Sequence, residues 1–405
     1  MAPDEAAFLD RVCAAPDDDG PRLIFADWLD ERGNPRGEFI RIQCALDRLP
    51  ADDPRRPDLT DREAMHLARF HAAWSEPVRG IAGWAEFRRG FIETVNIEAR
   101  QFLLHAAALF RLAPIRHVRF LDVGSTLRRL TESAFLARLS AITIFAQHLN
   151  EDLTKALTES PHLGAVRHLN VGRNRVGDRG AERLAASPRF RTLTHLDLSH
   201  NAIGDTGVRA IAYSTNLAGL ESLELRRNEL SRAGLATLLA SPVLTRMGYL
   251  GLGSNSVGAP LELTPQAGSS VSLKELDLSE NGMTADSTRR LTESPGLAAL
   301  ARLDLQNNEV GNEGASALAD WSGAAALRVL HLADNRIGDE GARALAHSTY
   351  LHNLTELDLS DNPIHDPGAF DFLNAPALPR LRRLGVPYLG LTPQMRRALV
   401  ARYGG

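Results

Sequence analysis

An asparagine recurs about every 27 residues between positions 174 and 362, and each copy closes the same phrase, Leu-x-x-Leu-x-Leu-x-x-Asn. Residues 193–201 and 327–335 are two clear copies. The eight asparagines are Asn174, Asn201, Asn228, Asn255, Asn281, Asn308, Asn335 and Asn362. A fixed period of this length predicts stacked units, each of which shares its core only with its neighbours.

Each repeat unit combines a strand pattern with a helix pattern. Apolar residues alternate within the phrase, as at Leu223 and Leu225, which predicts a short strand with one buried face. The segment that follows, such as residues 341–346, has helical spacing. Parallel strands lie about 4.8 Å apart and packed helices about 8–10 Å apart, so a stack of such units must bend. We predict an α/β solenoid that is curved, with parallel strands on its concave face and helices on its convex face.

The asparagine at the end of each strand is expected to be structural. Its side-chain amide both donates and accepts hydrogen bonds, so it can bond backbone groups in the bend and in the next coil. Gln147 lies 27 residues before Asn174 and extends the same series with another amide.

The phrase and its continuation, Ile-Gly-Asp-x-Gly-Ala-x-x-Leu-Ala, resemble the ribonuclease-inhibitor-like class of leucine-rich repeats. Residues 166–380 hold eight regular copies, and residues 91–165 read as degenerate leading repeats with strands near 91–97, 115–120 and 139–144. Residues 381–405 are predicted to form a terminal strand and a capping helix that begins at Thr392 and Pro393. Two prolines and a Gly-Ser run make a helix unfavourable in residues 259–272.

The first 48 residues do not repeat. They predict a small all-helical cap with helices up to about residue 15, over 22–33 and over 37–46, and residues 17–21 as a turn. The string over residues 17–43 is similar to the repeat-companion domain that precedes leucine-rich repeats in planctomycete bacteria, which implies a bacterial source and no known activity. Residues 49–90 are predicted to be a polar linker, a connecting helix near 61–75 and a joining stretch from 84 to 90.

Composition bounds the possible partners. The net charge is −4 and the pI about 6.4, so no electrostatic argument favours nucleic acid. No apolar run approaches the roughly 20 residues of a membrane span, and the acidic start Met-Ala-Pro-Asp-Glu does not resemble a signal peptide. We therefore expect a soluble, cytoplasmic chain without a membrane partner, with a monomer favoured. Cys13 and Cys44 have apolar neighbours and are expected to be buried thiols.

The candidates for chemistry are weaker than the binding surface. The aspartates at 17–19 lack the spacing of a calcium loop. His168 and His195 occupy the same column of adjacent strands, so a zinc-dependent or small-molecule site near them is an alternative hypothesis. Neither cysteine has a neighbouring histidine in sequence. We predict no enzyme activity, no cofactor and no metal.

The polar positions of the strands are the preferred functional site. The phrase Leu-x-x-Leu-x-Leu points its polar residues to the concave face, and arginines gather toward its N-terminal half while acids dominate its C-terminal half. The partner-binding residues predicted there are His195, Asp197, Glu224, Arg226, Arg227, Tyr249, Glu275, Asp277, Arg302, Asp304, His331 and Asp358. We predict a protein-interaction scaffold that acts as an inhibitor or adaptor of an unknown protein partner. Self-assembly through the helical cap is a further alternative.

Overall fold

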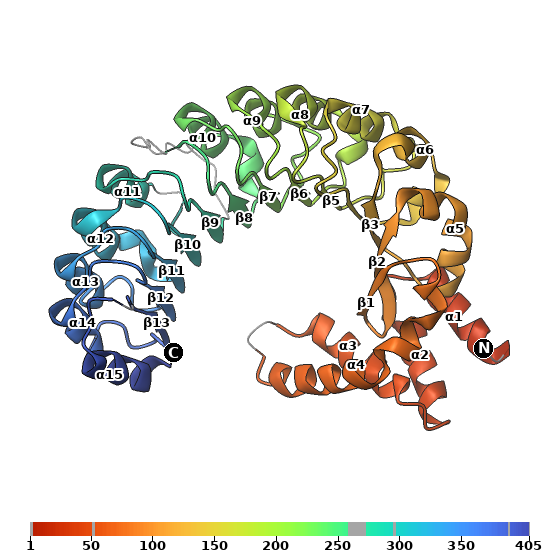
Figure 1. The fold of residues 1–405 in the computed structure, drawn as a ribbon, viewed down its shortest axis with the longest axis horizontal. Coiled ribbons are helices and arrows are strands. Elements are labelled where there is room, and N and C mark those ends of the chain that lie inside the picture. Colours follow the sequence, from red (N-terminus) through yellow and green to blue (C-terminus); the bar gives the residue numbers. More distant parts are fainter. Residues whose placement is uncertain (1–2, 51–52, 258–272, 295–296, 388, 405) are drawn as a thin grey trace. The chain divides into compact units, whose positions relative to one another are not determined.

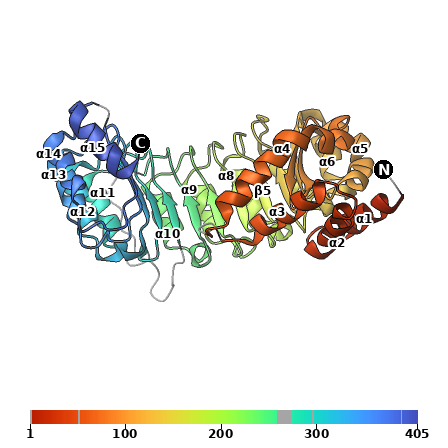
Figure 2. The ribbon, with the colours of Figure 1, turned by 90° about the horizontal axis from the view of Figure 1, so that it is seen from below.

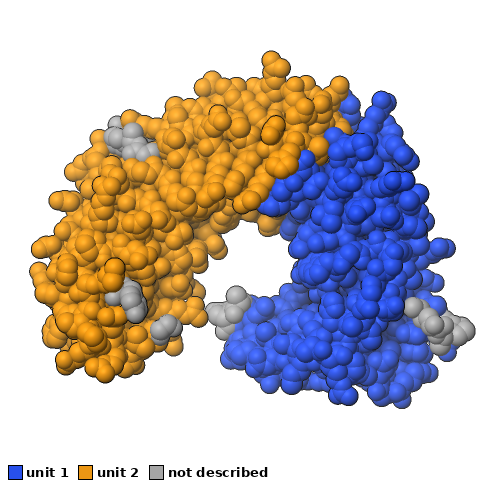
Figure 3. All heavy atoms as spheres, in the orientation of Figure 1, with its two compact units in different colours: residues 1–147, 159–171 blue, residues 148–158, 172–405 orange. Residues whose placement is uncertain are grey.

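The computed structural model describes residues 3–50, 53–257, 273–294, 297–387 and 389–404. The chain divides into two compact units, which Figure 3 colours separately. Unit 1 comprises residues 1–147 and 159–171, and unit 2 comprises residues 148–158 and 172–405. The segment 259–272, where we expected no helix, lies outside the described residues. The domain boundaries expected from the sequence remain predictions.

Thirteen strands form one open sheet in chain order. The first two strands pair antiparallel, whereas β2 to β5 and β6 to β13 pair in parallel. The strands are β1 Trp84–Arg88, β2 Phe91–Glu98, β3 His117–Leu121, β4 Ala141–Thr143, β5 His168–Asn170, β6 His195–Asp197, β7 Ser222–Glu224, β8 Tyr249–Gly251, β9 Glu275–Asp277, β10 Arg302–Asp304, β11 Val329–His331, β12 Glu356–Asp358 and β13 Arg383–Gly385. Helices precede the sheet and alternate with its strands, so the predicted α/β solenoid class is confirmed.

Unit 1 begins with four helices that differ in detail from the prediction. The helices of this unit are α1 Pro3–Ala14, α2 Asp19–Asp30, α3 Arg36–Arg48, α4 Arg56–Arg79, α5 Ala99–Leu112 and α6 Leu127–Thr131. The predicted turn at residues 17–21 is wrong, because the side chain of Asp18 accepts from the N–H of Gly20 and α2 begins at Asp19. A proline in the first helical turn does no harm, since its missing N–H would have had no helical partner there.

Two further expectations for unit 1 are corrected. The connecting helix α4 has 24 residues and begins at Arg56, so it takes up part of the predicted linker. The stretch expected only to join cap and solenoid is instead a strand, β1, which forms a hairpin with β2. Alternating burial in β1, with Ala85 and Phe87 inside, explains why these residues extend rather than coil.

The turn of this hairpin docks against helix α3. Gly90 has φ +84°, and a Cβ there would lie 2.2 Å from a side-chain carbon of Ile40, so the turn requires glycine. The backbone N–H of Gly90 donates to Gln43 Oε1 at 2.7 Å, and Gln43 Nε2 donates to the carbonyl of Phe87 at 3.2 Å. The N-terminal helices are thereby bonded to the first strands of the sheet.

A buried ion-pair network joins the same elements. Arg22 in α2 has no exposed surface, and its guanidinium donates to Glu93 Oε1 at 2.7 Å and to the carbonyl of Pro16 at 2.8 Å. Arg89 in the hairpin turn donates to the same Glu93 oxygen at 2.9 Å. Two guanidinium groups therefore share one buried carboxylate, which offsets part of the cost of burying charge.

Unit 2 is built from regular coils of one strand and one helix. Its helices are α7 Glu151–Glu159, α8 Gly177–Ala186, α9 Asp205–Ala212, α10 Arg232–Leu239, α11 Ala285–Thr292, α12 Gly311–Ala319, α13 Asp339–Ala346, α14 Asp366–Leu373 and α15 Pro393–Tyr403. The last residue of α7, Glu159, is assigned to unit 1. Within this unit the strands lie on the inner side of the arc and the helices on its outer side (Figure 1). Seen from below, its coils follow one another in chain order (Figure 2). One leucine from the middle of each strand is buried between the layers, as Leu223 and Leu330 show.

The asparagines of unit 2 form a ladder of hydrogen bonds between coils. Asn228 Oδ1 accepts from the backbone N–H groups of Asn201 and Ile203, each at 3.0 Å, in the preceding coil. Its Nδ2 donates to Leu198 of that coil and to Leu225 of its own. We expected the side-chain amide to bond the next coil, and this is wrong: it bonds the bend of the preceding coil.

Each residue immediately before a ladder asparagine has a left-handed backbone conformation. The φ values lie between 50° and 55° at Arg173, His200, Arg227, Ser254, Glu280, Asn307, Asp334 and Asp361. The backbone N–H at this position donates to the following coil, as from His200 to the carbonyl of Arg226 at 2.8 Å. The sequence hides this requirement, since glycine occupies none of the eight positions.

A second polar ladder lies at the helix starts. Asp178 Oδ1 accepts from the backbone N–H groups of Gly204 and Gly207 at 2.7 and 2.9 Å, so it caps the helix of the next coil. Asn312 and Asp339 do the same for the coils that follow them. Arg232, 27 residues after Asp205, breaks this series. The Asp in the Ile-Gly-Asp phrase is therefore a capping residue for its neighbour.

Candidate functional site

The strands of unit 2 align the polar residues predicted for the concave face. The first strand positions pair in register, as His195 with Ser222 and Arg302 with Val329. One row runs His195, Ser222, Tyr249, Glu275, Arg302, Val329 and Glu356, and a second runs Asp197, Glu224, Gly251, Asp277, Asp304, His331 and Asp358. Ten of the twelve predicted partner-binding residues thus fall in two continuous rows, while Arg226 and Arg227 follow β7. The role of all twelve in binding remains a prediction.

The acidic row has a structural task that the sequence analysis missed. Asp197 Oδ1 accepts from the backbone N–H of Ser199 at 2.9 Å. The same bond to the residue two positions later, at 2.7 to 3.0 Å, is made by Glu224, Asp277, Asp304 and Asp358. Such bonds hold the chain as it turns out of each strand. Half of each carboxylate is therefore already committed to the fold.

Arg226 bridges two coils across the concave face. It lies after β7. Its guanidinium donates to Oδ2 of Asp277, within β9, at 3.4 Å, and to Oγ of Ser279, just after β9, at 3.0 Å. It also bonds the carboxylate of Glu280. The path crosses Gly253, where a Cβ would lie 2.8 Å from an Arg226 nitrogen. Glycine in β8's coil thus makes room for an arginine from its neighbour.

Glu224 and Tyr249 lie beside this bridge. The Tyr249 hydroxyl donates to Glu224 Oε2 at 2.6 Å. A Cβ at Gly251 would meet both carboxylate oxygens of Glu224 at 2.4 Å, so this glycine also clears space. Burial raises the pKa of Glu224, and burial together with the neighbouring Glu224 charge raises the pKa of Tyr249. Tyr249 is therefore a neutral donor. Tyr249 and Arg226, both predicted to bind a partner, already form hydrogen bonds within the chain.

His331 links two acids farther along the rows. Its Nδ1 lies 3.2 Å from Asp304 Oδ2 and its Nε2 lies 3.3 Å from Glu356 Oε1. The hydrogen bond to Asp304 is the largest cause that raises the pKa of His331. When protonated, this imidazole donates to carboxylates on both neighbouring strands.

Three other acids on the same face remain exposed and outside this pairing. Glu275 opens β9, while Asp334 and Asp361 occupy the left-handed position before a ladder asparagine. All three are exposed, and none forms an ion pair or side-chain hydrogen bond with any residue that the structure describes. Asp334 and Asp361 were absent from the predicted partner-binding set, and their spacing of 27 was the signal that could have added them.

Two histidines show that charge changes along unit 2. His200 has a lowered pKa, first because of burial and then because the guanidinium groups of Arg173, Arg227 and Arg226 surround it. His331 has a raised pKa among carboxylates. Arginines therefore lie around His200, whereas carboxylates lie around His331.

The alternative hypothesis of a zinc or small-molecule site near His168 and His195 gains no group of metal ligands among the described residues. In the described ranges, no group of three or more His, Cys, Asp and Glu side chains is arranged to hold a metal ion. The His195 Nδ1 lies 2.9 Å from Oγ1 of Thr194, the residue that precedes β6. Cys13 and Cys44 are buried and free, as expected, and burial raises the pKa of each thiol to about 11. Of the helices in the described part of the chain, none has the length and apolar character to span a membrane.

Comparisons with known proteins agree with this architecture. A family profile described as "Leucine Rich repeat" matches residues 166–185, 191–212, 269–287, 296–319, 326–346 and 350–373. Residues 213–268, which contain Arg226, Tyr249, Gly251 and Gly253, fall between the matched segments. No curated protein matches the chain.

Among solved structures, the chain is similar to an internalin (inlF) from Listeria monocytogenes. That match has 18% identity and a TM-score of 0.45, and it covers 76% of this chain and 93% of the internalin chain. TLR13 in a complex with ssRNA13 matches with 17% identity and a TM-score of 0.45, over 73% of this chain and 43% of that chain. The profile matches, the repeat spacing and the asparagine ladder agree that leucine-rich repeats occur within residues 166–373.

Proposed function

We propose that the protein is a non-catalytic scaffold that binds a partner protein on the concave face of unit 2, as an inhibitor or adaptor. The observation that carries the proposal is the charge asymmetry of that face. Arginines surround His200 at one end, while exposed carboxylates without ion pairs stand at the other. The ribonuclease-inhibitor-like subclass and the repeat-companion identity of residues 1–48 belong to the same proposal.

The acidic end is the part that fits a partner best. Glu275, Asp334 and Asp361 are exposed, and their carboxylates form no ion pair or side-chain hydrogen bond with a described residue. A basic partner surface would gain attraction from these groups without first breaking ion pairs of the scaffold. The Arg226 bridge and the His331 bridge would hold the surrounding surface rigid, which lowers the ordering cost of association.

The departures from the repeat pattern sharpen the site. Arg226 reaches over Gly253 to Ser279 in the coil of β9. Arg226 and Gly253 lie outside the matched repeat segments, whereas Ser279 lies within one. Repeat consensus alone does not require an arginine bridge with paired glycines. We propose that it orients the approach of the partner along the rows, with the arginine end repelling its basic patch.

The test uses a neutralised concave variant and a matched convex one. The concave variant is Glu275→Gln, Asp334→Asn and Asp361→Asn, in which asparagine retains the tolerance for positive φ. The control is Glu182→Gln, Glu313→Gln and Asp320→Asn, which removes the same charge from exposed sites on or next to helices α8 and α12. Wild type and both variants would be used for affinity enrichment from native lysate, with mass spectrometric identification.

The proposal expects one partner that the wild type and convex control retain equally and that the folded concave variant loses. Retention should also fall as salt rises, because exposed charges are screened. Equal recovery by all three proteins would move the binding site away from the acidic end. Recovery of no specific partner by the wild type would count against the scaffold role itself.

A further inference from the structure

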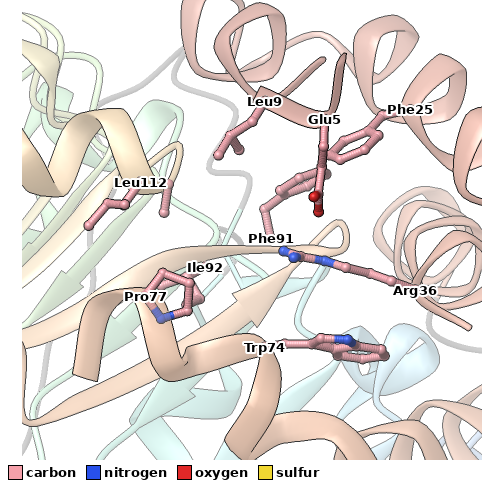
Figure 4. A pocket seen from close by; sticks show the side chains of 10 residues that line it. Glu5, Leu9, Phe25, Arg36, Trp74, Pro77, Phe91, Ile92 and Leu112 are labelled. Atoms are coloured by element: carbon pink, nitrogen blue, oxygen red, sulfur yellow. The ribbon is translucent and has the colours of Figure 1, made fainter. Parts of the chain in front are cut away.

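A pocket in unit 1 lies among the N-terminal helices and the start of the sheet (Figure 4). The pocket is partly open to solvent, and its walls come from α1, α2, α3, α4, β2 and the end of α5. The apolar walls include Leu9, Phe25, Trp74 and Phe91. Most of its lining side chains are apolar, and Glu5 and Arg36 are the charged side chains among them.

Arg36 places a guanidinium group in this pocket. It is the first residue of α3, and its backbone N–H donates to Asn34 Oδ1 at 3.0 Å, which fixes the start of the helix. The guanidinium carbon lies 5.1 Å from the Phe91 ring centroid and 5.9 Å from that of Trp74. Two aromatic rings therefore hold the planar group toward the open space, as Figure 4 shows.

The hydrogen-bonding capacity of Arg36 is mostly unused. A guanidinium group has five N–H donors. Its single side-chain bond within the described chain is a long one, 3.4 Å from Nη2 to the carbonyl of Gly90. Its Nε is buried without a partner, and no described carboxylate lies within ion-pair distance. Burial lowers the pKa of Arg36 to about 10, so the group still carries its charge at neutral pH.

Arg22, in the adjacent helix α2, is a buried arginine of the same unit that has an ion-pair partner, although its Nε, like that of Arg36, has none. Its guanidinium bonds Glu93 at 2.7 Å and two backbone carbonyls. A buried charge without such partners is costly. Arg36 has the aromatic support of a built site but lacks the anion that completes the pairing.

Glu5 brings a carboxylate into the same pocket. It lines the pocket from α1, and Figure 4 shows its carboxylate directed toward the side of Arg36. Its charge acts on Arg36 and raises the arginine pKa, but the two groups form no ion pair. An incoming anion would compete with Glu5 for the guanidinium group and would be repelled by it.

We propose that this pocket binds a small organic monocarboxylate, with its carboxylate on Arg36 and its apolar body between Phe25, Trp74 and Phe91. A carboxylate matches the forked donors of a guanidinium group. A single negative charge suits one unpaired cation, whereas a doubly charged phosphate would carry an excess charge into apolar walls. The pocket would thus make the helical cap a ligand-responsive part of the protein, independent of the concave face.

The test is a titration of the full chain with acetate, propionate and benzoate, followed by ligand-observed NMR. Propanamide and inorganic phosphate serve as the neutral and doubly charged comparisons. We expect saturable binding of the carboxylates that strengthens from acetate to propionate, with no binding of propanamide. Binding of propanamide as strong as propionate, or stronger binding of phosphate, would overturn the proposed ligand class.

Two variants test the residues, with a matched control. Arg36→Met should reduce propionate affinity at least about tenfold, which corresponds to the loss of one charged hydrogen-bonded contact. Arg69→Met removes an arginine from the exposed face of α4 and should leave affinity unchanged. Unchanged propionate binding by a folded Arg36→Met protein would overturn the assignment.

Glu5→Gln keeps the proposal testable should Arg36→Met fail to fold. The substitution removes the neighbouring negative charge and retains the side-chain length. Propionate affinity should rise several-fold in this variant. Unchanged or weaker binding would show that the carboxylate does not meet Arg36 beside Glu5.

Discussion

The start of unit 1 and the coils of unit 2 both bury polar groups, but they satisfy the hydrogen bonds of these groups with different chemistry. In unit 2, the buried polar side chains are neutral hydroxyls and amides, and the ladder amides bond to a coil about 27 residues away, as Asn335 does to Asn362. In unit 1, the buried polar groups include charges, and Arg22 meets Glu93 across 71 residues of sequence. A repeated local solution leaves a periodic trace in the sequence, whereas a single long-range pairing leaves none.

The difference also concerns cost. A buried amide loses a modest free energy when a partner is removed, whereas a buried charge left without its partner loses far more. One substitution in the buried charge network should therefore lower the free energy of unfolding of unit 1 strongly, whereas the loss of one ladder asparagine should lower that of unit 2 less. Three of the four tryptophans, Trp28, Trp74 and Trp84, lie in unit 1, and Trp321 lies in unit 2. Fluorescence and circular dichroism together can follow the two units.

The largest effect is expected for Arg22→Met. The substitution leaves Glu93 and Arg89 buried without one of their partners, and we expect the free energy of unfolding of unit 1 to fall by about 3–5 kcal/mol. Denaturant unfolding followed by tryptophan fluorescence measures the change. Arg32→Met, at an exposed site of the same region, is the control. A loss below about 1 kcal/mol would contradict the role given to the network.

A smaller effect is expected for Asn335→Ala in unit 2. The fully buried Asn335 accepts from Val310 and donates to Leu305 and Ala333 in its own and the preceding coil. Their backbone groups would lose a partner, which should cost about 2–4 kcal/mol. Unfolding followed by circular dichroism measures it, with Asn307→Gly at an exposed site as the control. If both variants unfold alike, the ladder does not stabilise the coils as described.

The left-handed position should show a still smaller, conformational effect. Asn307 has φ 55°, which β-branched residues adopt poorly. Asn307→Val should lower the free energy of unfolding by about 1–2 kcal/mol, whereas Asn307→Gly should be nearly neutral. Thermal unfolding of both variants checks the sign. A Val variant as stable as the Gly variant would show that this φ imposes no requirement.

The smallest effect is a pH dependence that has opposite sign at two histidines. The raised pKa of His331 means that its charged form stabilises the fold below pH 6.5 and that this contribution is lost as pH rises through the folded pKa. The lowered pKa of His200 means that its contribution is present above pH 6.5 and is lost as pH falls through its folded pKa.

The check compares His331→Gln and His200→Gln with wild type in unfolding measurements from pH 5 to 8. The stability gap between wild type and His331→Gln should be widest at the acidic end. The gap for His200→Gln should be widest at the neutral end. The same pH profile for both variants would contradict the charge asymmetry along unit 2.

Periodicity explains how far the sequence could be interpreted. The spacing of the leucines and asparagines predicted the strands, the helices and the α/β solenoid class, because each coil repeats the same local contacts. The same spacing could not reveal that Arg226 crosses Gly253 to Ser279, since that bond joins coils at a departure from the pattern. Nor could it reveal Arg36 in its pocket, which five helices and strand β2 assemble.

The role proposed for the concave face is tested most directly by hydrogen–deuterium exchange of the protein with and without its captured partner. The account predicts slower exchange in the strands and bends from β9 to β12, around Glu275, Asp334 and Asp361, with little change on helices α8 and α12. Protection confined to those helices or to unit 1, with the strands unchanged, would contradict it.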